Sequence, residues 1–238
     1  MRVLFIGNSH TYFHDMPHTF ARMCAQLTGQ MPEVTMLAYS ERSLAWHREE
    51  YFSLRFALLY GHYDYCVLQQ QAHPFPDEDL TRSSVLRILS LCESAGTKPV
   101  LMMTWAEKAF PEHFLPMQRC YTALSDETGA ILAPVGELFD TIRQTHPEIE
   151  LYWHDGEHAS IYGDYLIAAV LAALLCQTTD LSGLDDQAID FDLDFEGEDG
   201  MPLAKERATD CCVPLDSEKA SLLRSVVSGC LGGGSFHA

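Results

Sequence analysis

The sequence has few basic residues for its length. Its 238 residues include 15 Lys and Arg against 34 Asp and Glu, which gives a formal net charge of −19. A chain of this charge repels the phosphates of nucleic acids and the headgroups of anionic lipids. We therefore expect neither nucleic acid nor a membrane among its partners, and the sequence leaves the oligomeric state open.

Long apolar runs and paired cysteine motifs are also missing. No stretch approaches the roughly 20 apolar residues of a membrane helix, and no basic region, apolar segment and cleavage site precede the apolar run at 2–7. The eight cysteines form no C-x-x-C pair and show no zinc-binding spacing. These absences predict a cytoplasmic protein whose thiols stay reduced.

Short β-rich runs alternate with amphipathic segments through the first 145 residues. The expected strands are 2–7, 33–39, 63–69, 99–105 and 130–135, and the expected helices are 17–27, 46–59, 78–94, 112–127 and 136–144. Strand and helix pairs with short connections form right-handed crossovers, which produce a parallel sheet covered on both faces. The pattern predicts a three-layer α/β/α sandwich around a five-stranded parallel sheet.

The last third of the chain changes character. Residues 158–176 are nearly all apolar and predict a helix buried against the sheet. Residues 180–199 contain nine acidic residues and no basic one, which is typical of a solvated loop, and a helix is expected over 216–228 with Asp216 or Ser217 as its cap. We therefore predict a catalytic domain over 1–178, with an acidic loop and a C-terminal helix (179–238) appended to it.

Ser9 is the first candidate for chemistry, because it directly follows the first strand. Ligands of an open parallel sheet gather beyond the carboxyl ends of its strands, although a serine there can also serve as a helix cap or turn residue. Asp155 and His158 lie three residues apart around Gly156, just before the long apolar helix. This spacing lets a carboxylate hold Nδ1 of an imidazole whose Nε2 faces a serine, which is the arrangement of a serine nucleophile and its base.

Two sequence blocks carry a family resemblance. "FIGNSHT" (5–11) resembles the first block of the SGNH (GDSL-like) hydrolases, and "DGEHASIYGDYLIAA" (155–169) is similar to their last block. The likeness runs from about residue 2 to 176, while the G-x-S-x-G elbow of the α/β hydrolases is absent. The resemblance implies a flavodoxin-like sandwich, Ser9 as nucleophile, His158 as general base, Asp155 as its orienting partner, and no cofactor.

The second and third family blocks differ from the commonest pattern. "YSERSLAWH" (39–47) places Ser40 and Glu41 where many members have glycines, and "LQQQAHPF" (68–75) lacks the usual catalytic asparagine. We expect the oxyanion to be bound by the N–H of Ser9, by an N–H near Ser40 or Glu41, and by the side chain of Gln71. Alternation along an extended strand puts Gln71 on the same side as Gln69 and opposite Gln70.

Three further side chains are expected to contact the substrate: Gln69, His73 and Trp105. Trp105 lies at the end of the fourth predicted strand, where simple packing is an equally good explanation. His10, His14 and His18 repeat every four residues, a spacing that would gather them on one face of a helix. Pro17 interrupts that face, so we expect no metal site.

The resulting hypothesis is a serine esterase that forms an acyl-enzyme on Ser9. Its substrate would be a small ester, in particular an acetyl ester of a carbohydrate or similar metabolite. The altered second and third blocks motivate a rival from another class, a binding or scaffolding domain that keeps the fold without catalysis. Acyl transfer to an acceptor other than water is a third reading, which the sequence does not separate from hydrolysis.

Overall fold

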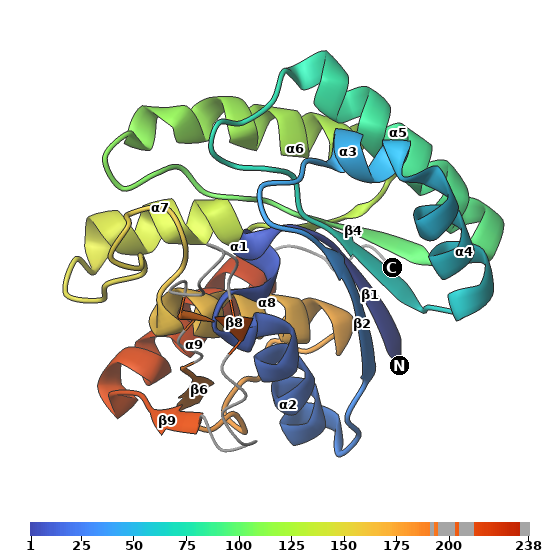
Figure 1. Ribbon diagram of the computed structural model, residues 1–238. Helices are drawn as coiled ribbons and strands as arrows, with labels where there is room; N and C mark the ends of the chain where they lie inside the picture. Colours follow the sequence, from blue (N-terminus) through green and yellow to red (C-terminus); the bar gives the residue numbers. More distant parts are fainter. Residues whose placement is uncertain (191–192, 195–202, 205–211, 234–238) are drawn as a thin grey trace.

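A five-stranded parallel sheet forms the centre of the molecule (Figure 1). The computed structural model describes residues 1–190, 193–194, 203–204 and 212–233. The strands lie in the order β2-β1-β3-β4-β5, and each neighbouring pair is parallel. Their bounds are β1 Arg2–Gly7, β2 Glu33–Ala38, β3 Tyr65–Leu68, β4 Lys98–Met102 and β5 Ile131–Ala133. This order is the flavodoxin-like one. In such a sheet the ligand crevice lies beyond the carboxyl ends of β1 and β3, because the connections that follow these two strands run to opposite faces of the sheet.

Helices cover both faces of the sheet, as predicted (Figure 1). One layer consists of α2 Met16–Thr28, α7 Val135–Thr145, α8 Ile161–Leu175 and α9 Ser217–Gly232, and the other of α3 Leu44–Glu49, α4 Tyr51–Gly61, α5 Glu78–Ala95 and α6 Phe114–Thr128. Side chains of β1 alternate between the two cores: Val3 and Phe5 join the first, Leu4 and Ile6 the second. The three-layer sandwich is therefore confirmed.

The remaining elements are short. They are α1 Ser9–Tyr12, η1 Phe13–Asp15, η2 Pro111–His113, and the strands β6 Gln187–Ile189, β7 Leu193–Asp194, β8 Leu203–Ala204 and β9 Cys212–Pro214. β6 pairs with β9 and β7 with β8, both antiparallel. The predicted loop at 180–199 thus contains two short strands, while 191–192 and 195–199 lie outside the described residues. Asp216 caps α9 by accepting hydrogen bonds from two backbone N–H groups, and Leu223 and Val227 bury this helix against α8.

Several predicted elements differ in extent, and two of these differences bear on the site. The helix expected at 46–59 is two helices, because the backbone leaves the helical region at Glu50 (ψ 46°), while Ser43 caps α3. The strand expected to reach Trp105 ends at Met102, because Met102 pairs with Ala133, the last residue of β5, and no partner continues the ladder. Trp105 therefore lies in a loop and not at a strand end.

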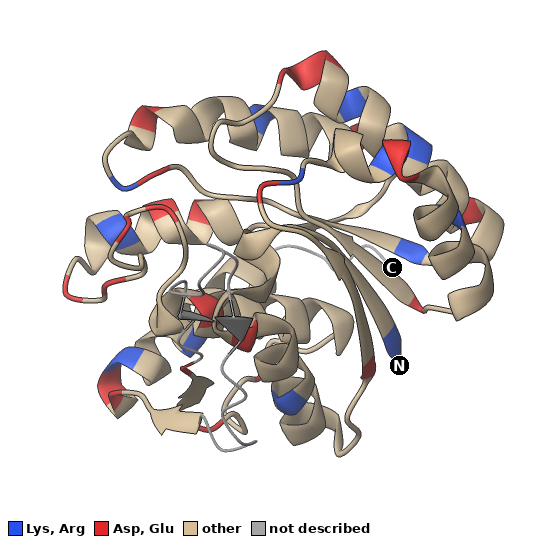
Figure 2. Ribbon diagram, in the orientation of Figure 1, with Lys and Arg blue, Asp and Glu red and all other residues tan. Residues whose placement is uncertain are grey.

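Charged residues are distributed over both helical layers, with basic side chains interspersed among acidic ones (Figure 2). Within the described residues, none of the helices combines the length and the apolar character that crossing a membrane requires.

Asp164 is an exception in the apolar helix α8. It is 2% exposed, and neither carboxyl oxygen has a hydrogen-bond partner among the described residues. Burial raises the pKa of Asp164 well above its ordinary value. The unfolded chain releases this proton above about pH 4, whereas the folded chain retains it. Folding stability therefore falls as the pH rises from about 4 toward the folded-state pKa.

We expect Asp164→Asn to stabilise the protein, by about 1 to 3 kcal/mol at pH 8 and by much less at pH 4. The amide has almost the same shape and cannot ionise. Urea unfolding of wild type and variant at both pH values measures the difference, with exposed Asp126→Asn as the control. A stability difference that does not change between pH 4 and pH 8 would contradict this account.

Candidate active site

Ser9 is the first residue of α1 and lies directly beyond the carboxyl end of β1. Gly7 ends β1 and has no room for a side chain, because a Cβ atom there would lie 2.4 Å from Gln69 Oε1. Asn8 caps α1, since its side chain accepts a hydrogen bond from the His10 N–H at 3.1 Å. This tight turn presents Ser9 at the edge of the sheet where ligands bind.

Gln69 stabilises the turn between β1 and α1 by hydrogen bonds from the protein interior. It is 1% exposed, and its Oε1 accepts hydrogen bonds from the Asn8 N–H (2.8 Å) and the Thr11 hydroxyl (2.9 Å). Its Nε2 donates to the Gln70 carbonyl at 2.5 Å. The structure thus corrects the expectation that Gln69 contacts substrate, because burial and internal hydrogen bonds occupy its carboxamide.

The structure brings Ser9, His158 and Asp155 into one hydrogen-bonded chain. Ser9 Oγ lies 2.8 Å from His158 Nε2, and Asp155 Oδ2 lies 2.6 Å from His158 Nδ1. If the Nδ1 proton is held by the carboxylate, Nε2 is free to accept the serine proton. The geometry is that of a nucleophile, a base and an orienting carboxylate.

The turn at Gly156 fixes the carboxylate. Gly156 has a φ of 75°, and Asp155 Oδ1 accepts the N–H groups of Glu157 (2.8 Å) and His158 (3.0 Å). Partial burial alone would raise the pKa of Asp155, but the hydrogen bonds from His158 and these backbone groups outweigh it and lower the pKa below its ordinary value. Asp155 is therefore ionised at neutral pH.

Aromatic rings enclose His158. Phe13 stacks on one side, with ring centroids 4.3 Å apart and planes 16° apart, and His10 stacks at 4.6 Å and 19°. Burial first, and then the neighbouring His158 and His73, hold the pKa of His10 well below its ordinary value. His10 is therefore neutral at neutral pH.

The segment with Ser40 and Glu41 lies beside α1. Asn8 Nδ2 donates to the Arg42 carbonyl at 3.1 Å, which ties this segment to the turn that carries Ser9. The Arg42 N–H donates to the Tyr39 carbonyl at 3.1 Å, and Glu41 between them has a φ of 62°. A positive φ favours glycine, so Glu41 adopts a backbone conformation that glycine takes more readily.

The glutamine-rich block does not continue the strand. β3 ends at Leu68, so residues 69–71 lie beyond the strand on which the expected alternation rests, although Gln69 bonds to α1 and Gln70 to α3 and α5 on the opposite side. Gln70 is fully buried, and its Oε1 accepts the N–H groups of Leu44 and Gln71, both at 2.9 Å. Gln71 is half-buried, and its carboxamide makes no hydrogen bond to a described residue. Its role as an oxyanion donor stays a prediction.

Trp105 and His73 both pack edge-on against His10. Trp105 is 1% exposed, stacks on Phe139 at 4.3 Å, and donates its indole N–H to the Glu157 carbonyl at 2.9 Å. His73 Nε2 lies 3.0 Å from the Trp105 carbonyl, and burial lowers the pKa of His73 more than Glu107 raises it. The structure places Trp105 in the packing around the site and leaves the His73 side chain 5% exposed, so substrate contact by His73 remains a prediction.

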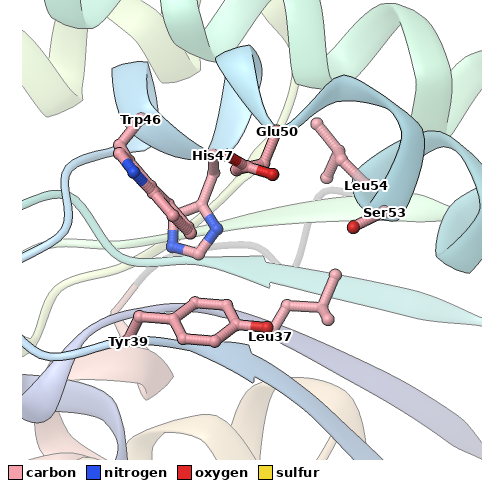
Figure 3. Close-up of a pocket in the computed structure, with 7 residues that line it drawn as sticks. All are labelled: Leu37, Tyr39, Trp46, His47, Glu50, Ser53 and Leu54. Atoms are coloured by element: carbon pink, nitrogen blue, oxygen red, sulfur yellow. The ribbon is translucent and has the colours of Figure 1, made fainter.

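A small cavity lies between the end of β2 and helices α3 and α4 (Figure 3). Its lining residues are Leu37, Tyr39, Trp46, His47, Glu50, Ser53 and Leu54. His47 is 3% exposed and its Nε2 lies 2.8 Å from the Gly7 carbonyl. Burial lowers the pKa of His47, and the bond to Gly7 offsets part of this shift. His47 therefore supports the turn as a neutral donor.

The three histidines spaced by four residues do not share a ligand. His14 Nδ1 pairs with Asp190 and His18 Nδ1 with Asp15, each at 3.3 Å, whereas His10 stacks on His158. In the described part of the chain, no three His, Cys, Asp or Glu side chains are grouped so that they could hold a metal ion.

The sequence did not predict that Phe13 and His10 stack on His158. The backbone of His14 and Asp15 is left-handed (φ 44° and 52°), which breaks any regular helix between α1 and α2. The only signal was the clustering of aromatic residues in "SHTYFHD" (9–15), and that pattern does not indicate which rings meet.

No protein-family model matches the sequence, and no curated protein matches it. Several solved structures are similar to the protein in fold. A GDSL-like lipase from Parabacteroides merdae is 18% identical, with a TM-score of 0.54 over 71% of this chain and 93% of that one. A lipase/acylhydrolase from Enterococcus faecalis is 13% identical, with a TM-score of 0.60 over 72% and 94%.

An acetylxylan esterase from Geobacillus stearothermophilus, in a catalytic mutant form, is 12% identical, with a TM-score of 0.60 over 71% of this chain and 91% of that one. Similarity at this level of identity establishes the fold. The chain has the SGNH-hydrolase fold that GDSL-like lipases and acetylxylan esterases share.

Proposed function

We propose that the protein is a serine esterase that cleaves small acyl esters through an acyl-enzyme on Ser9. The observation that carries the proposal is the hydrogen-bonded chain from Ser9 Oγ to His158 Nε2 (2.8 Å) and from His158 Nδ1 to Asp155 (2.6 Å). The fold it shares with lipases and esterases supports the same reading. A scaffolding domain without catalysis does not require a serine, an imidazole and a carboxylate in one hydrogen-bonded chain.

The reaction follows from the positions of these atoms. Ser9 Oγ attacks the acyl carbon while His158 Nε2 takes its proton, and the ionised Asp155 stabilises the imidazolium that forms. The imidazolium then protonates the departing alkoxide. In the second half, His158 takes a proton from water, the resulting hydroxide attacks the acyl carbon, and Ser9 leaves with the proton returned to it.

The oxyanion of each tetrahedral intermediate requires donors near Ser9. The first N–H of a helix has no intrahelical partner, so the Ser9 N–H is one candidate donor. A second comes from the Ser40 and Glu41 segment, which Asn8 holds beside α1. Gln71 supplies the third in this proposal, because its carboxamide is not engaged by the described residues.

The proposed substrate is an acetyl ester, with a carbohydrate hydroxyl as the alcohol. The shared fold with acetylxylan esterases supports this choice. We expect p-nitrophenyl acetate to be hydrolysed with a kcat/KM about 10-fold or more above that of p-nitrophenyl octanoate. A steady-state series from acetyl to octanoyl measures it. Preference for octanoyl would reject the acetyl assignment and leave the esterase, whereas no turnover of any member would reject both.

Activity should rise with pH across about pH 5 to 8, the range in which imidazoles titrate. Only neutral His158 accepts the serine proton, so activity is lost on the acid side. Because the pKa of Asp155 is lowered, the carboxylate stays ionised there and adds no second step. The pH profile of kcat/KM should therefore show one acid limb with a slope of one, and a flat profile would contradict His158 as the base.

We also infer a cytoplasmic location and a small-molecule ester as the partner. The seven cysteines in the described part of the chain are free thiols, as a reducing compartment favours. Fractionation of the source cells with an antibody against the protein tests the location, and recovery outside the cytoplasm would overturn it.

A further inference from the structure

Both faces of the His158 ring are covered by another ring. Phe13 lies 4.3 Å away at an interplanar angle of 16°, and His10 lies 4.6 Å away at 19°. Phe13 comes from η1 and His10 from α1, the helix whose first residue is Ser9. We call Phe13 and His10 the aromatic clamp.

Each ring of the aromatic clamp is itself held edge-on by other rings. His10 meets His73 at 5.0 Å and 81° and Trp105 at 5.2 Å and 85°. Phe13 meets Trp153 at 5.1 Å and 73° and His14 at 5.3 Å and 90°. Phe13 is 3% exposed and His10 is 6% exposed. The clamp is therefore a packed assembly with fixed ring planes.

The charges around His158 are few. Asp155 faces Nδ1 from its own turn, and His10 and His73 face the ring from α1 and from the loop after β3. Glu107 and Glu157 act on His73. Because burial keeps His10 neutral, the clamp presents two uncharged aromatic faces to His158.

We propose that Phe13 and His10 are positioning residues that hold the His158 ring in line between Ser9 and Asp155 and stabilise its protonated form. The consequence for catalysis rests on the proposed function, whereas the effect on the ring itself does not. A rotation of the ring would lengthen the bonds at Nε2 and Nδ1 together, and misplacement of this kind costs rate without weakening substrate binding. An imidazolium between two π faces is favoured over the same ion against aliphatic side chains.

The test compares Phe13→Leu and His10→Leu with wild type. The ring proton signals of His158 are followed by NMR against pH, with assignment from His158→Ala. We expect the titration midpoint to fall by about half a pH unit in each variant. On p-nitrophenyl acetate, kcat should fall about 10-fold while KM stays within about 3-fold.

Two further variants separate positioning from other roles. His10→Phe keeps the stacked ring without its nitrogens, so it should restore most of the kcat lost in His10→Leu. Phe20→Leu is the matched control, because Phe20 is a fully buried ring that meets Phe5 edge-on at 5.6 Å and 73° and does not contact His158 among the described ring pairs. It should lower the melting temperature without moving the His158 midpoint.

An unchanged midpoint in both leucine variants would overturn the proposal. So would a His10→Phe variant as slow as His10→Leu, because that result would assign the role to the imidazole nitrogens of His10. If the wild type hydrolyses no ester but the midpoints shift as expected, the proposed function fails and the clamp stands. If the esterase is active and the midpoints do not move, the clamp fails alone.

Discussion

Ser9→Ala is expected to lower kcat on p-nitrophenyl acetate by about 10⁴-fold or more, because no other group can form the acyl-enzyme. His158→Ala should cost a similar factor, and Asp155→Asn a comparable or smaller one. The hydrogen-bonded chain acts as a unit, so the double variant Ser9→Ala/His158→Ala should be no slower than either single variant.

The surface variant Ser94→Ala serves as the control, since its hydroxyl only donates to the Ser90 carbonyl within α5 at 2.8 Å. Circular dichroism should show all variants folded. Wild-type turnover in Ser9→Ala would remove Ser9 from the mechanism, and a large loss in Ser94→Ala would show that the assay reports stability.

Gln71→Ala is expected to lower kcat by about 10²-fold or more with little change in KM. One side-chain donor to an oxyanion typically contributes a factor of this size, and a contact made mainly in the transition state affects kcat and not binding. Because Gln71 is half-buried and its carboxamide makes no internal hydrogen bond to the described residues, the melting temperature should hardly change.

Gln69→Ala provides the contrast. It removes the acceptor of the Asn8 N–H and the Thr11 hydroxyl, so it should lower the melting temperature together with activity. Near-normal kcat in Gln71→Ala, with a loss in His73→Ala, would move the third donor from Gln71 to His73.

The fold, the position of Ser9 and the contact between Asp155 and His158 could be predicted from the sequence because each depends on a local pattern. The apolar run 2–7 becomes β1, and the switch point of a parallel sheet explains why a serine beyond its end lies at the edge where ligands bind. The three-residue spacing of Asp155 and His158 needs only one tight turn to bring the side chains to 2.6 Å. Ser9 and His158 are 149 residues apart, and their pairing was expected from the shared edge of the sheet and from the family resemblance.

Other features depend on contacts that no local pattern encodes. To predict on which side of the sheet each of the three glutamines lies, one must know the last residue of β3. The end of a strand is set by its partner strands, which the local sequence does not show. Gln70 and Gln69 look alike in sequence, yet each is buried against different backbone groups. The aromatic clamp depends on the left-handed backbone at His14 and Asp15, which no glycine or asparagine signals.

The central claim is that Ser9 is an activated nucleophile, and a serine-reactive fluorophosphonate tests it most directly. The protein is incubated with the probe at pH 8, digested, and the adduct is located by mass spectrometry. The account predicts a single adduct on Ser9 that is lost in His158→Ala, because the unassisted hydroxyl reacts too slowly. A folded wild-type protein that remains unlabelled, or that is labelled at another serine, would contradict it.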